Sequence, residues 1–119
     1  MTEELEIERF AGEGSDQGIL CLKGPLTAEN LDPFQNAIRR ERSSTVILDF
    51  SDVPYVDSAG LGSLVRAYVT GQKAGRRMAL SGVNDRVLRL LEITKTESLF
   101  LIFPTAEIAL ETFSHPAEA

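Results

Sequence analysis

A nearly unbroken apolar and β-branched stretch in the middle of the chain limits the folds open to it. Residues 45–50 read Thr-Val-Ile-Leu-Asp-Phe, whereas a strand with one wet face would alternate polar and apolar side chains. A run of this kind is typical of a strand that is covered on both faces, as in the middle of a parallel sheet. We therefore place it at the centre of an α/β domain.

The segments around this strand predict a β-hairpin and then helices and strands in alternation. Alternating apolar residues predict strands at 5–10 and 19–22, with a glycine-containing turn between them. The later elements are a helix ending near residue 42, the central strand, a helix stopped by Gly75, a strand at 78–80, a helix capped by Asn84, a strand at 99–103 and a helix capped by Thr105. This order predicts a mixed β-sheet with helices packed on it.

Some details of these elements are specific enough to be compared with a structure. Thr27, Asn30 and Asp32 compete as caps of the first helix, with Pro33 suited to its first helical position if Asp32 is the cap. The last helix is expected to bury three apolar side chains, namely Ile108, Ala109 and Phe113.

Size and charge fit a single folded domain that avoids polyanions. The chain has 119 residues, 43% of them hydrophobic, which is enough for one core, so we expect a domain over residues 1–113 and a flexible tail at 114–119. The net charge of -6 would repel phosphate backbones and anionic lipid headgroups, so nucleic acid is not expected as a partner.

The sequence also indicates a cytoplasmic protein without a cofactor. The first ten residues do not resemble a secretory leader, and no apolar stretch reaches the length that crosses a bilayer, so no direct membrane insertion is expected. Cys21 is the only cysteine, which excludes an internal disulfide and leaves a metal site without a thiolate cluster. We expect Cys21 to act as a small buried apolar residue.

The segment 53–62 carries the candidate chemistry, because it leads from the central strand into the second helix. Ser58 lies at the start of that helix, where a serine oxygen often caps an unsatisfied backbone amide. Gly60 and Gly62 would then only permit close packing against the sheet. Alternatively, a turn with so little side-chain bulk would expose the Ser58 hydroxyl to a kinase. The residue pattern alone leaves both interpretations open.

The block 46–62, from Val-Ile-Leu-Asp-Phe to Ser-Ala-Gly-Leu-Gly, closely resembles the signature of STAS domains, the sulfate transporter and anti-sigma factor antagonist family. The resemblance extends over nearly the whole chain. Residues 24–27 are similar to the family's turn after the second strand, and Leu99, Phe100 and residues 107–110 are similar to its closing strand and helix.

For a stand-alone domain, the resemblance implies an anti-sigma factor antagonist, which is not an enzyme. When unphosphorylated it would bind an anti-sigma factor with serine kinase activity and so release a sigma factor, and a metal-dependent serine phosphatase would reset it. Ser58 matches the phosphoacceptor and Asp57 the acidic residue before it. The implied docking face comprises Thr27, Asp57, Ser58, Ala59 and Gly60, together with Ser63 and Arg66 as exposed positions of the second helix.

The chain departs from the family pattern in the turn at 24–27. Family members commonly carry an acidic residue and an aspartate where this chain has Pro25 and Thr27, so a carboxylate expected near Ser58 is missing. Thr27 could itself accept a phosphate, although a capping or turn role is favoured for it.

The sequence also leaves other functions to consider. A STAS domain could instead serve as a scaffold or ligand sensor in a larger signalling or transporter assembly, without a switch at Ser58. A receiver-like domain would be phosphorylated on Asp57 and would need a magnesium site. A hydrolase is disfavoured because Val56 replaces the glycine of a nucleophile elbow and the only histidine is His115. Nucleotide binding is disfavoured because Val65 replaces the last glycine of a dinucleotide fingerprint.

Overall fold

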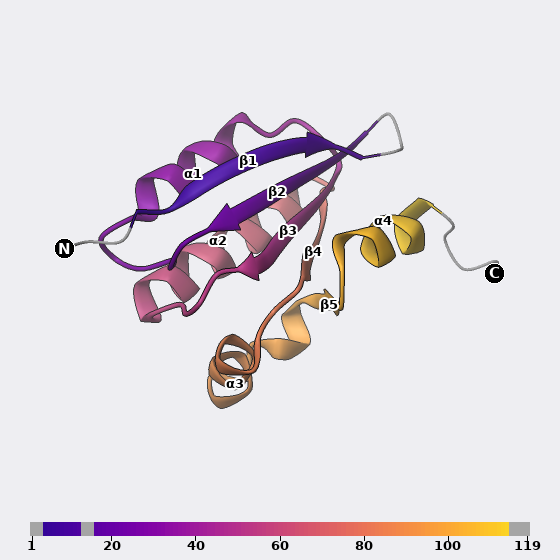
Figure 1. Cartoon of the computed structure of the whole chain (residues 1–119). Coiled ribbons are helices and arrows are strands. Elements are labelled where there is room, and N and C mark those ends of the chain that lie inside the picture. Colours follow the sequence, from indigo (N-terminus) through magenta and orange to yellow (C-terminus); the bar gives the residue numbers. More distant parts are fainter. Residues whose placement is uncertain (1–3, 13–15, 115–119) are drawn as a thin grey trace.

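The strands lie in the sheet in the same order as in the chain (Figure 1). The structure is a computed structural model, and it describes residues 4–12 and 16–114. The strands within these ranges are β1 (Glu6–Ala11), β2 (Gln17–Lys23), β3 (Thr45–Asp52), β4 (Arg77–Ser81) and β5 (Leu101–Phe103). β1 runs antiparallel to β2, and the remaining neighbours are parallel. The opening hairpin, the mixed sheet and the central strand are therefore confirmed.

The helices cover the two faces of this sheet unequally. They are α1 (Leu31–Arg40), α2 (Ser58–Lys73), α3 (Asp85–Ile93) and α4 (Ala106–Ser114), with a single 3-10 turn, η1 (Glu97–Leu99), before β5. The apolar side chains of α1, α2 and α3 join one core cluster, whereas α4 packs alone on the opposite face (Figure 1).

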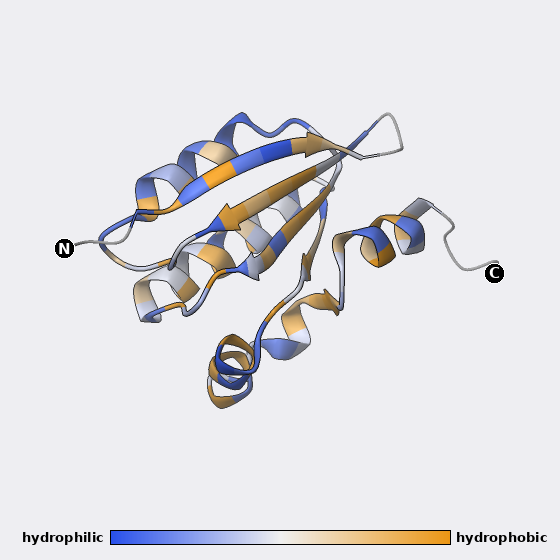
Figure 2. Cartoon of the chain, viewed as in Figure 1, coloured by the Kyte–Doolittle hydropathy of each residue, from blue (hydrophilic) through white to orange (hydrophobic). Residues whose placement is uncertain are grey.

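β3 contributes to both cores, as its sequence predicts. Val46, Leu48 and Phe50 are fully buried beneath α1 and α2, and Ile47 points to the other face, where it packs with Ala109. Figure 2 shows the resulting apolar ribbon along the middle strands, while the exposed helix faces are mixed. A strand covered on both faces gains burial from nearly every side chain, which explains its continuous apolar composition.

The structure corrects several details at the C-terminal end. Residues 99 and 100 precede β5, because the amides of Leu99 and Phe100 bond locally to carbonyls of the turn before them. Ile108 is 44% exposed, and Leu110 is buried in its place. Thr105 caps the helix as predicted, with its hydroxyl accepting from the Ile108 amide. The helix continues to residue 114, so the predicted tail loses one residue; positions 115–119, including the histidine, lie outside the described residues.

The structure selects one of the three candidate residues before α1, and it corrects the end of that helix and the environment of Cys21. Asn30, not Asp32, precedes α1, and the helix ends at residue 40 instead of 42. Cys21 is only half-buried and lies beside Asp49, on the same face of the sheet as α4. Desolvation, and to a smaller extent the charge of Asp49, raises the pKa of this thiol to about 11, so little thiolate is present at neutral pH.

A buried carboxylate ties β1 to the connection between α1 and β3. The Glu41 side chain, 2% exposed, accepts from Arg9 Nε at 2.9 Å and from Nη2 at 3.1 Å. The Ser43 amide donates to the same carboxylate at 3.2 Å. These hydrogen bonds, chiefly those from Arg9, lower the pKa of Glu41 to about 2 against the opposing effect of burial.

The first turn of α2 lies against the loop that follows β2. A Cβ added at Gly60 would overlap the carbonyl oxygen of Leu26, whereas one added at Gly62 would find nothing nearer than Arg66 Nη1 at 3.6 Å. The close-packing explanation is therefore right for Gly60 and wrong for Gly62. Only the first glycine fixes where the helix begins.

Gly60→Ala and Gly62→Ala form a matched pair that tests this approach. We expect Gly60→Ala to lower the free energy of unfolding by about 1–3 kcal/mol, because the backbone of residue 26 must move. Gly62→Ala should raise it by about 0.5–1 kcal/mol through helix propensity. Urea unfolding monitored by circular dichroism measures both, and equal effects would contradict the packing shown.

The Glu41 carboxylate should make stability pH-dependent in acid. Its folded pKa of about 2 lies below the ordinary 4.5, so its contribution is full above pH 4.5 and is lost as the pH falls towards 2. In Arg9→Gln the pKa should rise, and acid unfolding should begin at higher pH. Carbon-detected NMR titration and acid unfolding measure the two effects.

Lys23→Gln is the control, since it removes a cation whose partner, Glu8, is exposed. It should leave the acid-unfolding midpoint nearly unchanged. A midpoint that moves equally in the two variants would show that overall charge, and not the buried pair, sets the acid limit.

Candidate functional site

Ser58 is the first residue of α2, and its side chain is exposed. The cap is the residue before it: an Asp57 carboxylate oxygen accepts from the Gly60 amide at 2.8 Å. Within the described part of the chain the Ser58 hydroxyl makes no hydrogen bond. The capping interpretation of Ser58 is therefore wrong, and its oxygen faces solvent at the positive end of a helix.

Asp57 uses both carboxylate oxygens to join two segments of the chain. While one oxygen caps α2, the other accepts from the Ala28 amide at 3.0 Å. Hydrogen bonds from backbone amides to a carboxylate are stronger than those between neutral groups. Asp57 is thus a structural clamp between the start of α2 and the loop after β2.

The loop before Ser58 is held on two sides. Leu26 forms a parallel bridge with Val56, donating to the Tyr55 carbonyl at 3.2 Å and accepting from the Asp57 amide at 3.1 Å. On the other side, the Asn84 side-chain amide donates to the carbonyls of Val53, at 3.1 Å, and Pro54, at 3.2 Å. With these bonds, the exposed hydroxyl is presented by a fixed backbone.

Thr27 lies beside this junction but faces a turn of its own. Its amide and its hydroxyl both donate to Asn30 Oδ1, at 2.7 and 3.3 Å, and the Asn30 amide donates to the Thr27 carbonyl. The favoured turn role of Thr27 agrees with these bonds. The Asn30 side chain is engaged in this turn. Asn30 therefore precedes α1 but makes no side-chain hydrogen bond that caps the helix.

The other predicted docking residues are exposed to different degrees. Ala59 is half-buried beside Ser58, Gly60 is buried against the Leu26 carbonyl, and Arg66 is exposed. Ser63 is 4% exposed, so its prediction as an exposed position is wrong. The accessible part of the predicted face is therefore Ser58 with Arg66 farther along α2.

Two contributions to the site were missed by sequence analysis. Asn84 was predicted as the cap of α3, and its oxygen does accept from the Val87 amide at 2.8 Å, but its nitrogen also holds the loop before Ser58. The Ala28 amide supplies the second bond to Asp57. An asparagine at a helix start predicts that its side chain caps the helix, but it does not predict bonds to carbonyls that are distant in the sequence. A backbone amide is common to nearly every residue type, so the sequence cannot show which amide binds a given carboxylate.

Among the described residues, the Ser58 hydroxyl is the reactive group that this site presents. No group of three or more His, Cys, Asp or Glu residues in 4–12 and 16–114 is placed to hold a metal ion. Because both Asp57 oxygens accept backbone amides, a receiver-type phosphorylation of Asp57 would have to break the clamp. In the same ranges, no helix has the length and apolar character needed to cross a membrane.

Comparison with known proteins identifies the family of the chain. The model of the STAS domain family matches residues 10–109. The anti-sigma F factor antagonist of Paenibacillus polymyxa is 34% identical over 90 residues, covering 72% of this chain and 74% of its own. The anti-sigma-B factor antagonist of Staphylococcus aureus strain NCTC 8325 is 27% identical over 82 residues, covering 69% and 76%.

A solved structure gives the same result for the fold. It is a Thermotoga maritima protein named as a candidate anti-sigma factor antagonist, with a TM-score of 0.80 at 27% identity, covering 88% of this chain and 92% of its own. The family match runs from the end of β1, through the clamp at Asp57, to the first turn of α4. The chain belongs to the STAS domain family.

Proposed function

We propose that this chain is an anti-sigma factor antagonist that binds an anti-sigma factor with serine kinase activity and releases it when Ser58 is phosphorylated. The names of the two relatives support the general role. The observation that carries the switch is the exposed Ser58 hydroxyl at the first position of α2, which has no hydrogen-bond partner among residues 4–12 and 16–114 because Asp57 provides the cap.

A phosphate at this position is compatible with the fold. It would bring about -1.5 to -2 charges to the amino end of a sixteen-residue helix, where the helix dipole and free amides favour an anion. Asp57 would remain engaged by its two amides and could not turn away to relieve the repulsion. The phosphate would therefore change the charge of the surface while the backbone stays in place.

The same phosphate would oppose docking. A partner shaped for a neutral hydroxyl would have to desolvate a dianion next to the Asp57 carboxylate. Binding would weaken by several kcal/mol, on the order of a hundredfold or more. A charge change on a fixed backbone is thus sufficient as an off-switch.

Ser58 is a better phosphoacceptor than Thr27. The Thr27 hydroxyl is half-buried and donates to Asn30, whereas Ser58 is exposed and bonded to nothing among the described residues. The turn at Thr27 lacks the carboxylate that many family members place there, and we assign the role of that carboxylate to no other residue.

A metal-dependent serine phosphatase in the cytoplasm completes the proposed cycle by removing the phosphate.

Partner capture with Ser58 variants tests the switch. Wild type and Ser58→Ala should retain an ATP-binding serine kinase, and Ser58→Asp should lose it by at least about tenfold, because a carboxylate imitates part of the phosphate charge. Ser98→Asp is the control, since it adds the same charge at another exposed serine. Quantitative mass spectrometry of the captured proteins gives the ratios.

The chemistry of the phosphoprotein provides a second readout. Incubation with the captured kinase and ATP should label wild type but not Ser58→Ala, and the label should survive acid and hydroxylamine. A label lost in hydroxylamine would indicate an aspartyl phosphate. Equal kinase recovery by all four proteins would refute the switch and favour a scaffold role.

A further inference from the structure

A groove of about 560 Å³ separates the carboxyl-terminal halves of α1 and α2. Its apolar side is formed by Phe34 and Ile38 of α1 and by Ala67 of α2, and at its far end the Arg76 side chain packs against Gly71. Small-molecule sites in proteins have this size and combine an apolar lining with a few polar groups. The groove therefore has the form of a ligand site.

The charges around the groove oppose the charge of the protein. Arg39, Arg42, Arg66 and Arg76 line it, and they are four of the twelve Lys and Arg residues in a chain of net charge -6. Glu41 is the only carboxylate among the lining residues. An acidic protein that gathers a third of its cations around one apolar groove has a local preference for an anion.

The guanidinium groups remain available to an anion. Arg76 is held in place by neutral acceptors, with Nε donating to the Ser43 carbonyl at 3.1 Å and Nη2 to the Glu41 carbonyl at 2.5 Å. The carboxylate of Glu41 is occupied by Arg9, which is not a lining residue. In the described ranges no ion pair neutralises any of the four lining arginines.

We propose that this groove binds a small amphipathic anion, a molecule with an apolar body and one carboxylate, sulfonate or phosphate group. The body would lie on Phe34, Ile38 and Ala67, and the acidic group would meet the arginines, with Arg76 already oriented by its two carbonyls. A guanidinium suits such a group because its planar donors can bond two oxygens at once.

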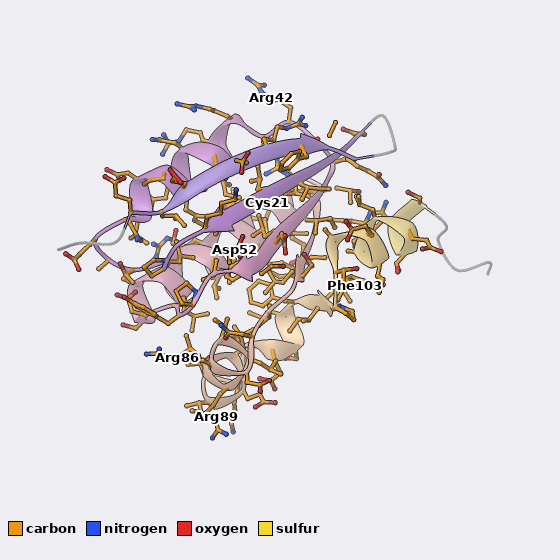
Figure 3. All side chains as sticks on the ribbon, viewed as in Figure 1. Cys21, Arg42, Asp52, Arg86, Arg89 and Phe103 are labelled. Atoms are coloured by element: carbon orange, nitrogen blue, oxygen red, sulfur yellow. The ribbon has the colours of Figure 1, made fainter. Side chains whose placement is uncertain are left out.

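The groove does not include the proposed switch residue Ser58, although its lining residues Ser63 and Arg66 were also predicted for the docking face. Its first lining residue on α2 is Ser63, which lies five residues, or about 7.5 Å of helix rise, beyond Ser58. Figure 3 shows Arg42 just beyond α1, far in the view from Arg86 and Arg89, which project from α3. Ligand binding here therefore goes beyond the proposed function and does not depend on it.

A pair of fluorescent probes tests the chemistry. Anilinonaphthalene sulfonate joins an aromatic body to one anionic group, and N-phenylnaphthylamine has nearly the same body without the charge. We expect the sulfonate to bind the folded protein saturably, one per chain, and the neutral probe to bind at least about tenfold more weakly. Added salt should weaken the sulfonate more than the neutral probe.

Variants place the binding in the groove. Arg42→Glu, at an exposed residue without a described partner, should weaken the sulfonate about tenfold. Thr70→Trp, at an exposed lining position, should fill the groove and abolish saturable binding. Arg89→Glu makes the same charge change on α3, and it should leave the affinity within about twofold, as should Ser58→Asp.

The binding and folding measurements on these variants distinguish the proposed ligand site from its alternatives. Thermal melting checks that each variant is folded, and Arg42→Glu carries the test if Thr70→Trp melts early. Equal affinity of both probes, or equal loss in Arg42→Glu and Arg89→Glu, would overturn the proposal. So would sedimentation showing that wild type dimerises and that Arg42→Glu does not, because a second copy would then occupy the groove.

Discussion

The carbonyl group of Leu26 is the point on which the site depends. Its oxygen accepts a hydrogen bond from the Asp57 amide and lies where a side chain on residue 60 would stand. It therefore fixes the position of the first turn of α2 against the loop after β2. The β2–β3 pairing brings the two segments to the same edge of the sheet, and the bridge to Val56 extends that pairing beyond the strands. A hydroxyl one residue past the clamp is thereby held still and left open to solvent.

Much of this fold was predictable because its strongest signals are local. The continuous strand at 45–50, the caps at Asn84 and Thr105 and the stop at Gly75, which has a φ of 82°, each arise from a residue type with a narrow conformational preference. The order of the strands was not predictable in the same way, since the hydrophobic pattern specifies faces but not neighbours.

The errors arise where two suitable residues stand side by side. Asp57 and Ser58 are both good caps, and the choice between them is made by the Ala28 amide, twenty-nine positions away. Ile108 and Leu110 both fit a helical face, but the stripe that meets β3 and β4 runs through 106, 109, 110 and 113. Ser63 is buried at the groove between α1 and α2, and the pattern of its own helix does not indicate this.

The two borders of the sheet have a further consequence. An edge strand presents unpaired amides and carbonyls that another chain can extend into a longer sheet. β1 carries Glu6, Glu8 and Arg9, and peeling it away would strand the Glu41 charge in the interior. β5 offers only three residues despite its exposed Leu101. One edge strand thus carries charges and the other is very short, so neither edge offers a long, uncharged strand on which further copies could pair into fibres.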